Sequence, residues 1–299
     1  MDIVLNLNKP RDISSHNAVS KAKKILKAKK AGHTGTLDPS ATGVLLVCLN
    51  KATRLASYFS ALDKEYRVVM KLGEVTDTQD ATGKVIERSK RIEVDTALIK
   101  EALRSFEGKT IQHPPMFSAL KHKGTPLYKY ARKGIEIERK PREVNIPHIE
   151  LSDIDLPYVT FSAVCSKGTY MRTLCNDIGE KLRVGGHLFA LERTATGQFG
   201  IIDSLTLEDL SDISKGQSIA KGVYTMDQAL SWLPEFQINK LLTKPVAHGN
   251  PIKLNSGPEL SSELKAATGI RIKSTDGDLL AIGSYSADRN IIKMDVVFA

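Results

Sequence analysis

The chain has 299 residues, more than one domain of ordinary size holds, so we expect a large domain followed by a smaller one. Its composition, 41% hydrophobic and 26% charged, excludes a wholly disordered protein. The formal net charge of +9 favours a polyanionic partner.

Hydropathy and cysteine content predict the compartment. The longest apolar run, residues 44–49, is far shorter than the roughly 18 residues of a membrane span. The N-terminal residues show neither the charged nor the apolar region of a signal peptide. Three cysteines, Cys48, Cys165 and Cys175, without C-x-x-C spacing argue against a disulfide framework and a cysteine-rich zinc site. We therefore expect a cytoplasmic protein with reduced cysteines and no membrane partner.

The positive charge is concentrated in two short segments. Residues 20–30 hold six lysines and no acidic residue, and residues 119–142 hold eight basic residues against two glutamates. Either segment alone is equally well explained as a solvated helix face or loop. Together they carry more than the net charge of the chain, and the second also holds Tyr128 and Tyr130. The pair therefore favours a surface that binds a nucleic-acid backbone and stacks on bases.

The first half of the chain gives a mixed set of predicted elements. Apolar spacing and capping residues predict a strand at 4–7, a helix that begins after Ser14 or Ser15 and runs to residue 26, a buried strand at 44–49, a strand at 66–72, and a helix that Asp95 caps and Gly108 stops. Side chains on a strand alternate between its two faces, so Val68 and Met70 lie on the same face of the strand at 66–72.

The second half continues this mixture. It predicts a strand at 159–165, a helix from 171 to 182 that Gly185 and Gly186 close, and strands at 270–275, 279–285 and 291–298, the first two joined by a tight Asp276-Gly277 turn. Strands and helices do not alternate strictly, so the predicted class is α+β. The character changes near Leu233 and Pro234, which predicts domains at 1–235 and 236–299.

Residues 32–43 form the densest group of unusual residues. Three glycines permit close backbone approach, and Asp38-Pro39 favours a turn. The Asp38 carboxylate either caps a structural turn or is held rigid and accessible for chemistry; spacing alone leaves both open. The order of residues is that of neither a P-loop nor a dinucleotide-binding loop. His33 has no metal-type partner nearby, so no metal site is predicted.

Five motifs in order then carry a resemblance. Residues 32–47 resemble the active-site motif of the TruB family of tRNA pseudouridine synthases. Residues 7–16, with Lys9-Pro10, resemble that family's N-terminal motif, and residues 63–68 and 72–78 resemble its K-x-Y strand and the following loop. Residues 114–119 resemble its RNA-binding insertion, and residues 166–172 its K-G-T-Y-x-R motif. The last sixty residues are similar, more weakly, to a PUA module.

The resemblance implies a pseudouridine synthase fold and a cofactor-free reaction at uridine 55 in the T loop of tRNA. The enzyme would cleave the N1–C1′ bond, rotate the base and join C5 to C1′. Asp38 takes the place of the catalytic carboxylate, Arg172 that of the cation that orients it, and Tyr66 that of the ring lying against uracil. Whether Asp38 attacks C1′, attacks the ring or assists loss of the C2′ proton stays open.

The resemblance also implies substrate-binding residues. His33 would fill the place of the extruded base, Tyr170 would line the pocket entrance and Leu191 would pack on the base. Contacts with the RNA are further expected from Lys9 and from the basic insertion at about 110–142, through Lys121, Lys123, Lys129 and Arg132. The loop at 76–83 indicates the bacterial type, which we expect to be a monomer that binds the tRNA T stem-loop without a guide RNA.

The sequence departs from the family pattern at two positions, and two other functions are alternatives to this interpretation. Asp12 stands where the family usually has glycine, and Glu192 where a second arginine is common. Aspartate tolerates a left-handed backbone better than most residues, so we expect the turn to survive. A non-catalytic RNA-binding protein of the same fold and a glycosylase that stops after cleaving the base are the rival functions.

Overall fold

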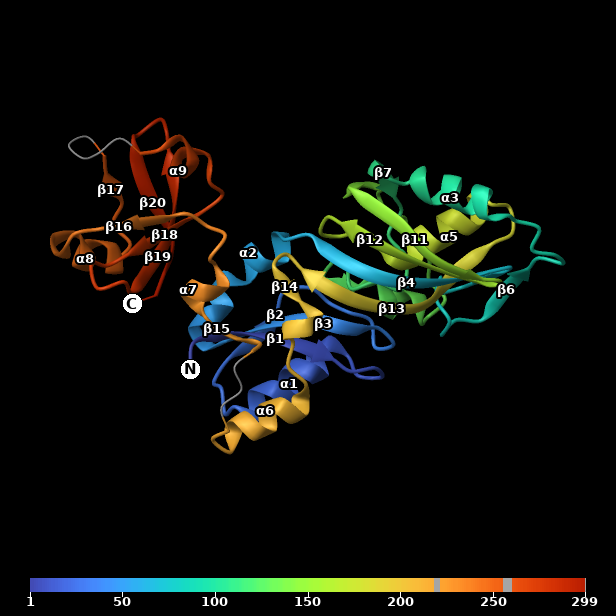
Figure 1. The fold of residues 1–299 in the computed structure, drawn as a ribbon, viewed down its shortest axis with the longest axis horizontal. Helices are drawn as coiled ribbons and strands as arrows, with labels where there is room; N and C mark the ends of the chain where they lie inside the picture. The colour runs from blue at the N-terminus through green and yellow to red at the C-terminus, as the bar shows by residue number, and fades with distance from the viewer. Residues whose placement is uncertain (218–220, 255–259, 299) are drawn as a thin grey trace.

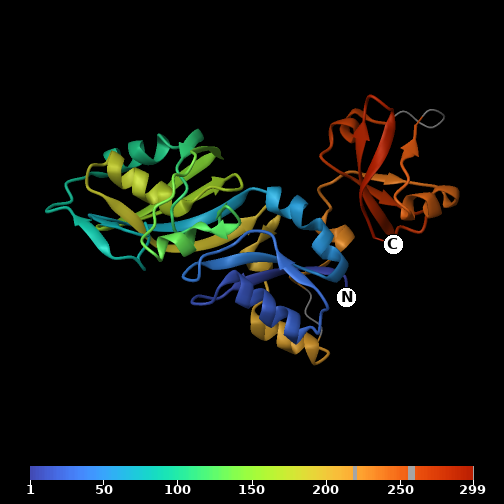
Figure 2. The ribbon, with the colours of Figure 1, turned by 180° about the vertical axis from the view of Figure 1, so that it is seen from behind.

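The computed structural model describes residues 1–217, 221–254 and 260–298. Figures 1 and 2 show a longer body built on one large sheet and, at one end of it, a smaller body with its own sheet. Within these described ranges no helix is long and apolar enough to cross a membrane.

A nine-stranded sheet is the frame of the larger body. Its main order is β11-β12-β4-β13-β3-β1-β15, with β2 beside β3 and β14 beside β13. Among the described residues every pairing is antiparallel except that of β13 with β3. The strands are β1 (Ile3–Lys9), β2 (Ala31–His33), β3 (Thr42–Leu49), β4 (Lys64–Leu72), β11 (His148–Asp155), β12 (Tyr158–Cys165), β13 (Gly186–Thr196), β14 (Phe199–Gly200) and β15 (Val223–Thr225). This mixed, largely antiparallel sheet confirms the α+β class.

Helices cover both faces of the sheet around β1 and β3. On one face lie α1 (Ser15–Ile25) and α6 (Leu207–Ser214); on the other lie η1 (Asn50–Leu55), α2 (Ala56–Ala61) and α7 (Met226–Ala229). Val4 and Leu5 therefore point into different apolar clusters and both are fully buried. The strand expected at 4–7 is present. Its side chains alternate between two apolar clusters, and neither face of the strand is exposed to solvent.

Side-chain caps explain where two predicted helices begin. The Ser14 hydroxyl accepts a hydrogen bond from the Asn17 N–H at 3.1 Å, and the Asp95 carboxylate accepts one from the Leu98 N–H at 2.8 Å. The helix after Asp95 is α3 (Thr96–Arg104), which ends before Gly108. Gly108 instead begins β7, so the predicted end of this helix was wrong. With α5 (Met171–Lys181), α3 packs on β4, β11 and β12.

A short hairpin and an insertion extend from this body, and the insertion contains a second short hairpin. β5 (Glu74–Thr76) pairs with β6 (Val85–Arg88), and η2 (Ile201–Asp203) follows β14. β7 (Gly108–Gln112) pairs with β10 (Arg142–Ile146), with Gln112 opposite Arg142. Residues 113–141 therefore form an insertion that leaves the larger body after Gln112 and returns to it at Arg142, directly opposite. They contain β8 (Lys121–His122), β9 (Thr125–Pro126) and α4 (Leu127–Ala131).

The smaller body is a five-stranded sheet of order β16-β18-β19-β20-β17. Its elements are β16 (Glu235–Gln237), α8 (Lys240–Ala247), β17 (Ile252–Lys253), α9 (Ser262–Ala266), β18 (Ile270–Lys273), β19 (Leu279–Ser286) and β20 (Ile291–Val297). The three predicted strands are confirmed. A tight turn that contains Asp276 and Gly277 joins the first two, as predicted: the Gly277 N–H donates to the Ser274 carbonyl at 3.1 Å, and the Ser274 hydroxyl accepts from the Asp278 N–H at 3.1 Å.

Candidate active site

The loop that carries Asp38 joins β2 to β3 and is anchored by two side chains, those of Ser15 and Arg193. The Ser15 hydroxyl accepts from the Leu37 N–H at 2.8 Å and donates to the Leu37 carbonyl at 2.9 Å. Arg193 on β13 donates to the carbonyls of Gly35 and Thr36, at 3.1 and 3.2 Å. Because the backbone of residues 35–37 is bonded directly before the turn, the loop holds Asp38 in one place.

A glycine lets β3 and β13 approach each other beside this loop. Gly43 has a φ of +101°, and a Cβ there would lie 2.2 Å from the Arg193 carbonyl oxygen. Only glycine fits both the left-handed backbone and the contact. The parallel pairing of Arg193 with Gly43 therefore depends on it, and this pairing brings β13 next to the Asp38 loop.

Arg172 is bonded to Asp38, as the resemblance implied. Its Nε lies 3.0 Å from the Asp38 Oδ2; the arginine side chain is 6% exposed and the aspartate 40%. The other guanidinium nitrogens donate to the Thr78 carbonyl at 3.3 Å and the Phe117 carbonyl at 2.7 Å. Arg172 is thus fixed by several partners, while the carboxylate it holds faces the solvent side.

A second carboxylate, that of Asp80, completes this group and was missed as a site residue. Its Oδ2 lies 3.5 Å from the Arg172 Nη1. Its Oδ1 accepts from the Thr78 hydroxyl and from the N–H and hydroxyl of Thr82, at 2.6 to 2.9 Å. The loop at 76–83 was noted for its family pattern, but no local signal in it indicates a contact with a helix almost a hundred residues later.

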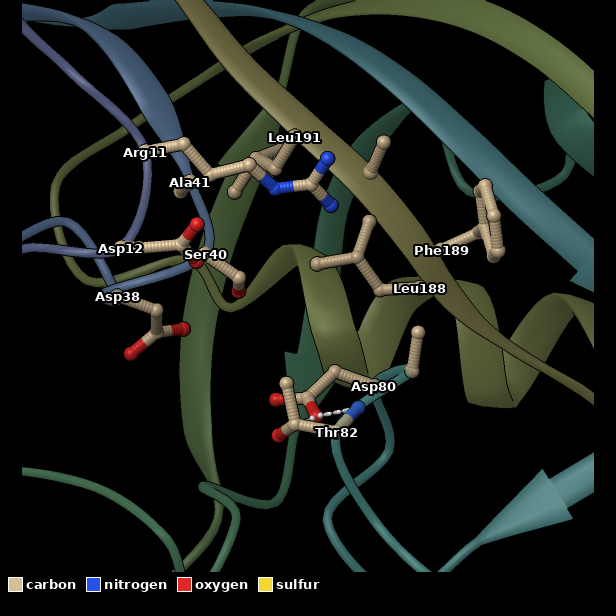
Figure 3. A pocket seen from close by; sticks show the side chains of 12 residues that line it. Arg11, Asp12, Asp38, Ser40, Ala41, Asp80, Thr82, Leu188, Phe189 and Leu191 are labelled. Carbon is tan, nitrogen blue, oxygen red and sulfur yellow. Dashed lines mark hydrogen bonds between the residues drawn. The ribbon is translucent and has the colours of Figure 1, made fainter.

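Asp38 faces a hollow of about 300 Å³ (Figure 3). Three carboxylates line it, together with one arginine and an apolar wall from β13. The lining residues are Arg11, Asp12, Asp38, Ser40, Ala41, Asp80, Ala81, Thr82, Leu188, Phe189, Ala190 and Leu191. The hollow is large enough for a nucleoside-sized group, with a carboxylate at one side and leucines at the other.

Burial raises the pKa of Asp38, and the negative charge of Asp80 raises it further; Arg172, Lys9 and Arg193 oppose this shift. An aspartate that must be ionised loses function as the pH falls through its pKa. The acid limb of the pH–rate profile should therefore lie above the usual value of 3.8.

Replacing Asp80 by asparagine should move that acid limb toward lower pH, because the substitution removes a charge that raises the Asp38 pKa. The measurement is kcat/KM against pH for the wild type and Asp80→Asn, with the exposed Asp153→Asn as control. An acid limb that stays in place or moves to higher pH in Asp80→Asn contradicts this account of the pKa.

Tyr66 lies beside the hollow without lining it. Its side chain belongs to the main apolar cluster and is 7% exposed, and its hydroxyl accepts from the Arg193 Nε at 3.2 Å. Burial raises the pKa of Tyr66, so the phenol stays protonated at neutral pH. Its contact with a base stays a prediction.

The other three candidates for the pocket differ in position. Leu191 lines the hollow from β13 (Figure 3). His33 ends β2 and is half-buried, and burial lowers its pKa, so the ring is neutral at pH 7. The Tyr170 ring lies 4.6 Å from the Arg142 guanidinium carbon, and its backbone exchanges hydrogen bonds with the Gln112 amide. Tyr170 does not line the hollow.

The expected contact of Lys9 with substrate needs correction. This lysine is fully buried, and its ammonium donates to the carbonyls of Pro10, Ile13 and Pro39 at 2.8, 2.8 and 3.2 Å. Burial lowers its pKa to about 8, while Asp38 and Asp12 oppose that shift. All three donors are used within the protein, so Lys9 ties the first turn to the Asp38 loop and is not available to RNA.

The basic residues predicted to meet RNA lie on the surface. Lys121, Lys123, Lys129 and Arg132 are exposed on the insertion, with the Arg132 guanidinium carbon 5.4 Å from the centre of the Tyr128 ring. The six lysines of residues 20–30 are exposed on and after α1. No ion pair involves any of these ten side chains within the described part of the chain.

Arg193 is the second residue whose importance sequence reasoning missed. It is 3% exposed and donates to three carbonyls, including that of Val44 at 3.0 Å, as well as to Tyr66. It joins the Asp38 loop, β3 and β4 around one guanidinium. In the sequence it is one arginine among many, next to the Glu192 that drew attention.

The fold and this site define a class of protein: an α+β protein in which a carboxylate, bonded to a buried arginine, lines an open hollow. Known proteins show which family this is. Residues 23–171 match the N-terminal domain of the TruB family pseudouridylate synthases, and residues 172–231 match the tRNA pseudouridylate synthase B C-terminal domain.

Relatives agree with these matches. The chain is 42% identical to tRNA pseudouridine synthase B of Clostridium tetani, over 92% of this chain and 93% of the relative, and 44% identical to that of Clostridium kluyveri, over 85% and 86%. It is similar to a solved H/ACA ribonucleoprotein bound to a substrate RNA containing 2′-deoxyuridine. That likeness has a TM-score of 0.74 and 27% identity, over 99% of this chain and 85% of that one. The chain belongs to the TruB family of pseudouridylate synthases.

Proposed function

We propose that this protein isomerises the uridine at position 55 in the T loop of tRNA to pseudouridine, as a cytoplasmic monomer that needs no guide RNA. Residues 1–235 carry the reaction, and the C-terminal sheet binds RNA. Family membership supports the tRNA substrate, because the relatives named above are tRNA pseudouridine synthases.

One observation carries the catalytic part of the proposal: a solvent-facing Asp38 carboxylate bonded to a buried Arg172 at the side of a nucleoside-sized hollow. A carboxylate with this exposure can reach the C1′ carbon as the N1–C1′ bond breaks, in the way a retaining glycosidase traps an electron-poor sugar carbon.

The remaining steps follow from the neighbouring groups. The freed uracil turns beside Leu191 until C5 attacks C1′ and displaces the Asp38 oxygen, which leaves as the carboxylate. C5 then loses its proton while N1 gains one. The protonated Tyr66 hydroxyl assists that proton exchange. Substrate and product have the same mass, and no oxidant or reductant is consumed.

Extrusion of the uridine explains the remaining predicted contacts. A base within a folded loop must leave its stack, which costs a few kcal/mol. The neutral His33 ring fills the vacancy that the extruded base leaves in the RNA stack. The insertion closes over the loop and its exposed basic side chains meet the backbone phosphates.

A T-arm RNA with 5-tritiated uridine at position 55 tests the function. Catalysis releases tritium and leaves the RNA mass otherwise unchanged. An RNA-binding protein without activity releases none, and a glycosylase produces free uracil and an abasic site. Either of the last two outcomes would replace the proposed function with its rival.

The insertion should control the salt dependence of binding. Replacing Lys121, Lys123, Lys129 and Arg132 by alanine should flatten the slope of log affinity against log salt by about 0.7 to 0.9 for each phosphate that the insertion no longer neutralises. A matched variant that replaces the exposed Lys90, Lys100, Arg104 and Lys181 should keep the wild-type slope. Equal slopes for the two variants would mean that the insertion does not meet phosphates.

A further inference from the structure

The charges around the hollow leave one cation uncommitted. Arg172 is bonded to Asp38 and Asp80 and to two carbonyls. Lys9 and Arg193 lie behind the Asp38 loop, where Lys9 donates to three carbonyls and Arg193 to three carbonyls and the Tyr66 hydroxyl. Arg11 is exposed and has neither an ion pair nor a side-chain hydrogen bond among the described residues. It is the single basic residue in the lining of the hollow.

The turn after β1 aims Arg11 across the hollow. Asp12 has a φ of +65°, so the turn survives where the family has glycine, and the Asp12 N–H donates to the Pro39 carbonyl at 2.8 Å. Figure 3 shows the Arg11 side chain reaching toward Leu191 on β13, with its guanidinium directed away from Asp38. The arginine therefore spans the hollow near its β13 wall.

A second, smaller hollow of about 190 Å³ adjoins the first. Arg11, Ser40, Ala190 and Leu191 line both hollows, so Arg11 and Leu191 stand at their common boundary. The second hollow also contains the exposed Arg67, on the outer face of β4, and one acid, Glu192. Two arginines against one glutamate give it a positive balance, whereas the first hollow has three carboxylates against Arg11.

These charges favour the uncharged nucleoside in the first hollow and its phosphate in the second. A phosphate placed in the first hollow would meet Asp12, Asp38 and Asp80, and like charges at short range in a partly desolvated site repel strongly. A uracil and ribose carry no charge and can enter it. A phosphate attached to the same nucleoside is favoured on the Arg11 side, where a guanidinium binds two phosphate oxygens at once.

We propose that Arg11, supported by Arg67, binds the backbone phosphate next to the extruded uridine in the second hollow. This inference rests on the proposed function and adds a positioning contact to it. The contact sets how deeply the ribose enters the first hollow, because the phosphate and C1′ belong to one nucleotide. Arg11 acts on the RNA backbone and takes no part in bond breaking.

The experiment measures affinity and turnover for a T-arm RNA and for two versions in which one phosphate flanking the target uridine is replaced by a neutral methylphosphonate. For unmodified RNA, Arg11→Gln should weaken binding roughly 10- to 100-fold, the range expected when a hydrogen bond to a charged group is removed. Arg67→Gln should weaken it less, and Arg11→Lys should restore part of the affinity. Arg104→Gln, on the exposed side of α3, is the matched control.

The decisive result is whether the Arg11→Gln substitution and the methylphosphonate in the RNA affect the affinity independently of each other. For one of the two linkages, the methylphosphonate should weaken wild-type binding but leave Arg11→Gln nearly unchanged, since the variant no longer binds that phosphate. If, at both linkages, the methylphosphonate weakens the binding of Arg11→Gln by the same factor as that of the wild type, the proposal is overturned. An Arg11→Gln variant, folded by its melting temperature, with wild-type affinity also overturns it. Because affinity is measured apart from tritium release, an inactive wild type would refute the proposed function and still leave this test of independence possible.

Discussion

Asp38→Asn should lower tritium release from 5-tritiated uridine by on the order of 10⁴-fold or more, the largest effect expected for this protein. Asparagine has nearly the same shape and can still accept a hydrogen bond from Arg172. It lacks the negative charge and the nucleophilic oxygen that the proposed attack on C1′ needs. Affinity for the T-arm RNA should remain, because the expected phosphate contacts come from other residues.

The control for this change is Asp153→Asn, an exposed aspartate on β11 far along the sheet. It should release tritium at the wild-type rate. A single-turnover measurement with enzyme in excess separates chemistry from product release. If Asp38→Asn releases tritium as fast as the wild type, the carboxylate has no part in the reaction and the mechanism proposed above is wrong.

Arg172→Lys should produce the second largest effect, a fall in turnover of roughly 10²- to 10³-fold, equivalent to about 3 to 4 kcal/mol of lost transition-state stabilisation. Lysine keeps the positive charge. Its single ammonium cannot reach Asp38, Asp80, Thr78 and Phe117 from the separate directions that the guanidinium nitrogens occupy. Asp38 would then lose its fixed orientation.

Two readouts separate orientation from a general loss of folding. Turnover at saturating RNA should fall in Arg172→Lys while the RNA affinity changes little. The acid limb of the pH–rate profile should also move to higher pH, because Arg172 lowers the Asp38 pKa against the effect of burial. An unchanged turnover number in a folded Arg172→Lys would refute the orienting role. A variant that does not melt cooperatively calls for the same measurements on Arg172→Gln.

Much of the fold could be predicted from local pattern. Ser14 and Asp95 cap the helices where capping chemistry predicts, and the alternation of Tyr66, Val68 and Met70 predicts the buried face of β4. The end of α3 was wrong because the glycine taken as a helix stop begins a strand instead. The turn with Asp276 and Gly277 after β18 is present, and Ser274, just before that pair, accepts its hydrogen bonds.

The candidate site divides in the same way. The residues Asp38, Arg172 and Tyr66 could be found because each lies in a motif whose neighbours are close in sequence. The roles of Asp80 and Arg193 could not, because each depends on partners far away in the chain: Arg172 lies 92 positions after Asp80, and the Val44 carbonyl lies 149 positions before Arg193. The role of Arg11 could not either, because the β13 residues that line the hollow with it are far away in the chain. The same is true of Lys9, whose burial no local pattern indicates.

The sequence by itself determined the α+β class, the concentration of charge in two segments and the family to which the chain belongs, since each follows from residue types and their near spacing. The tertiary structure alone decided which cations are used inside the protein and which remain for a ligand. Arg172, Arg193 and Lys9 look alike in a sequence with forty-three basic residues. Only the fold brings buried carbonyls to Arg193 and Lys9, carboxylates to Arg172, and open space to Arg11.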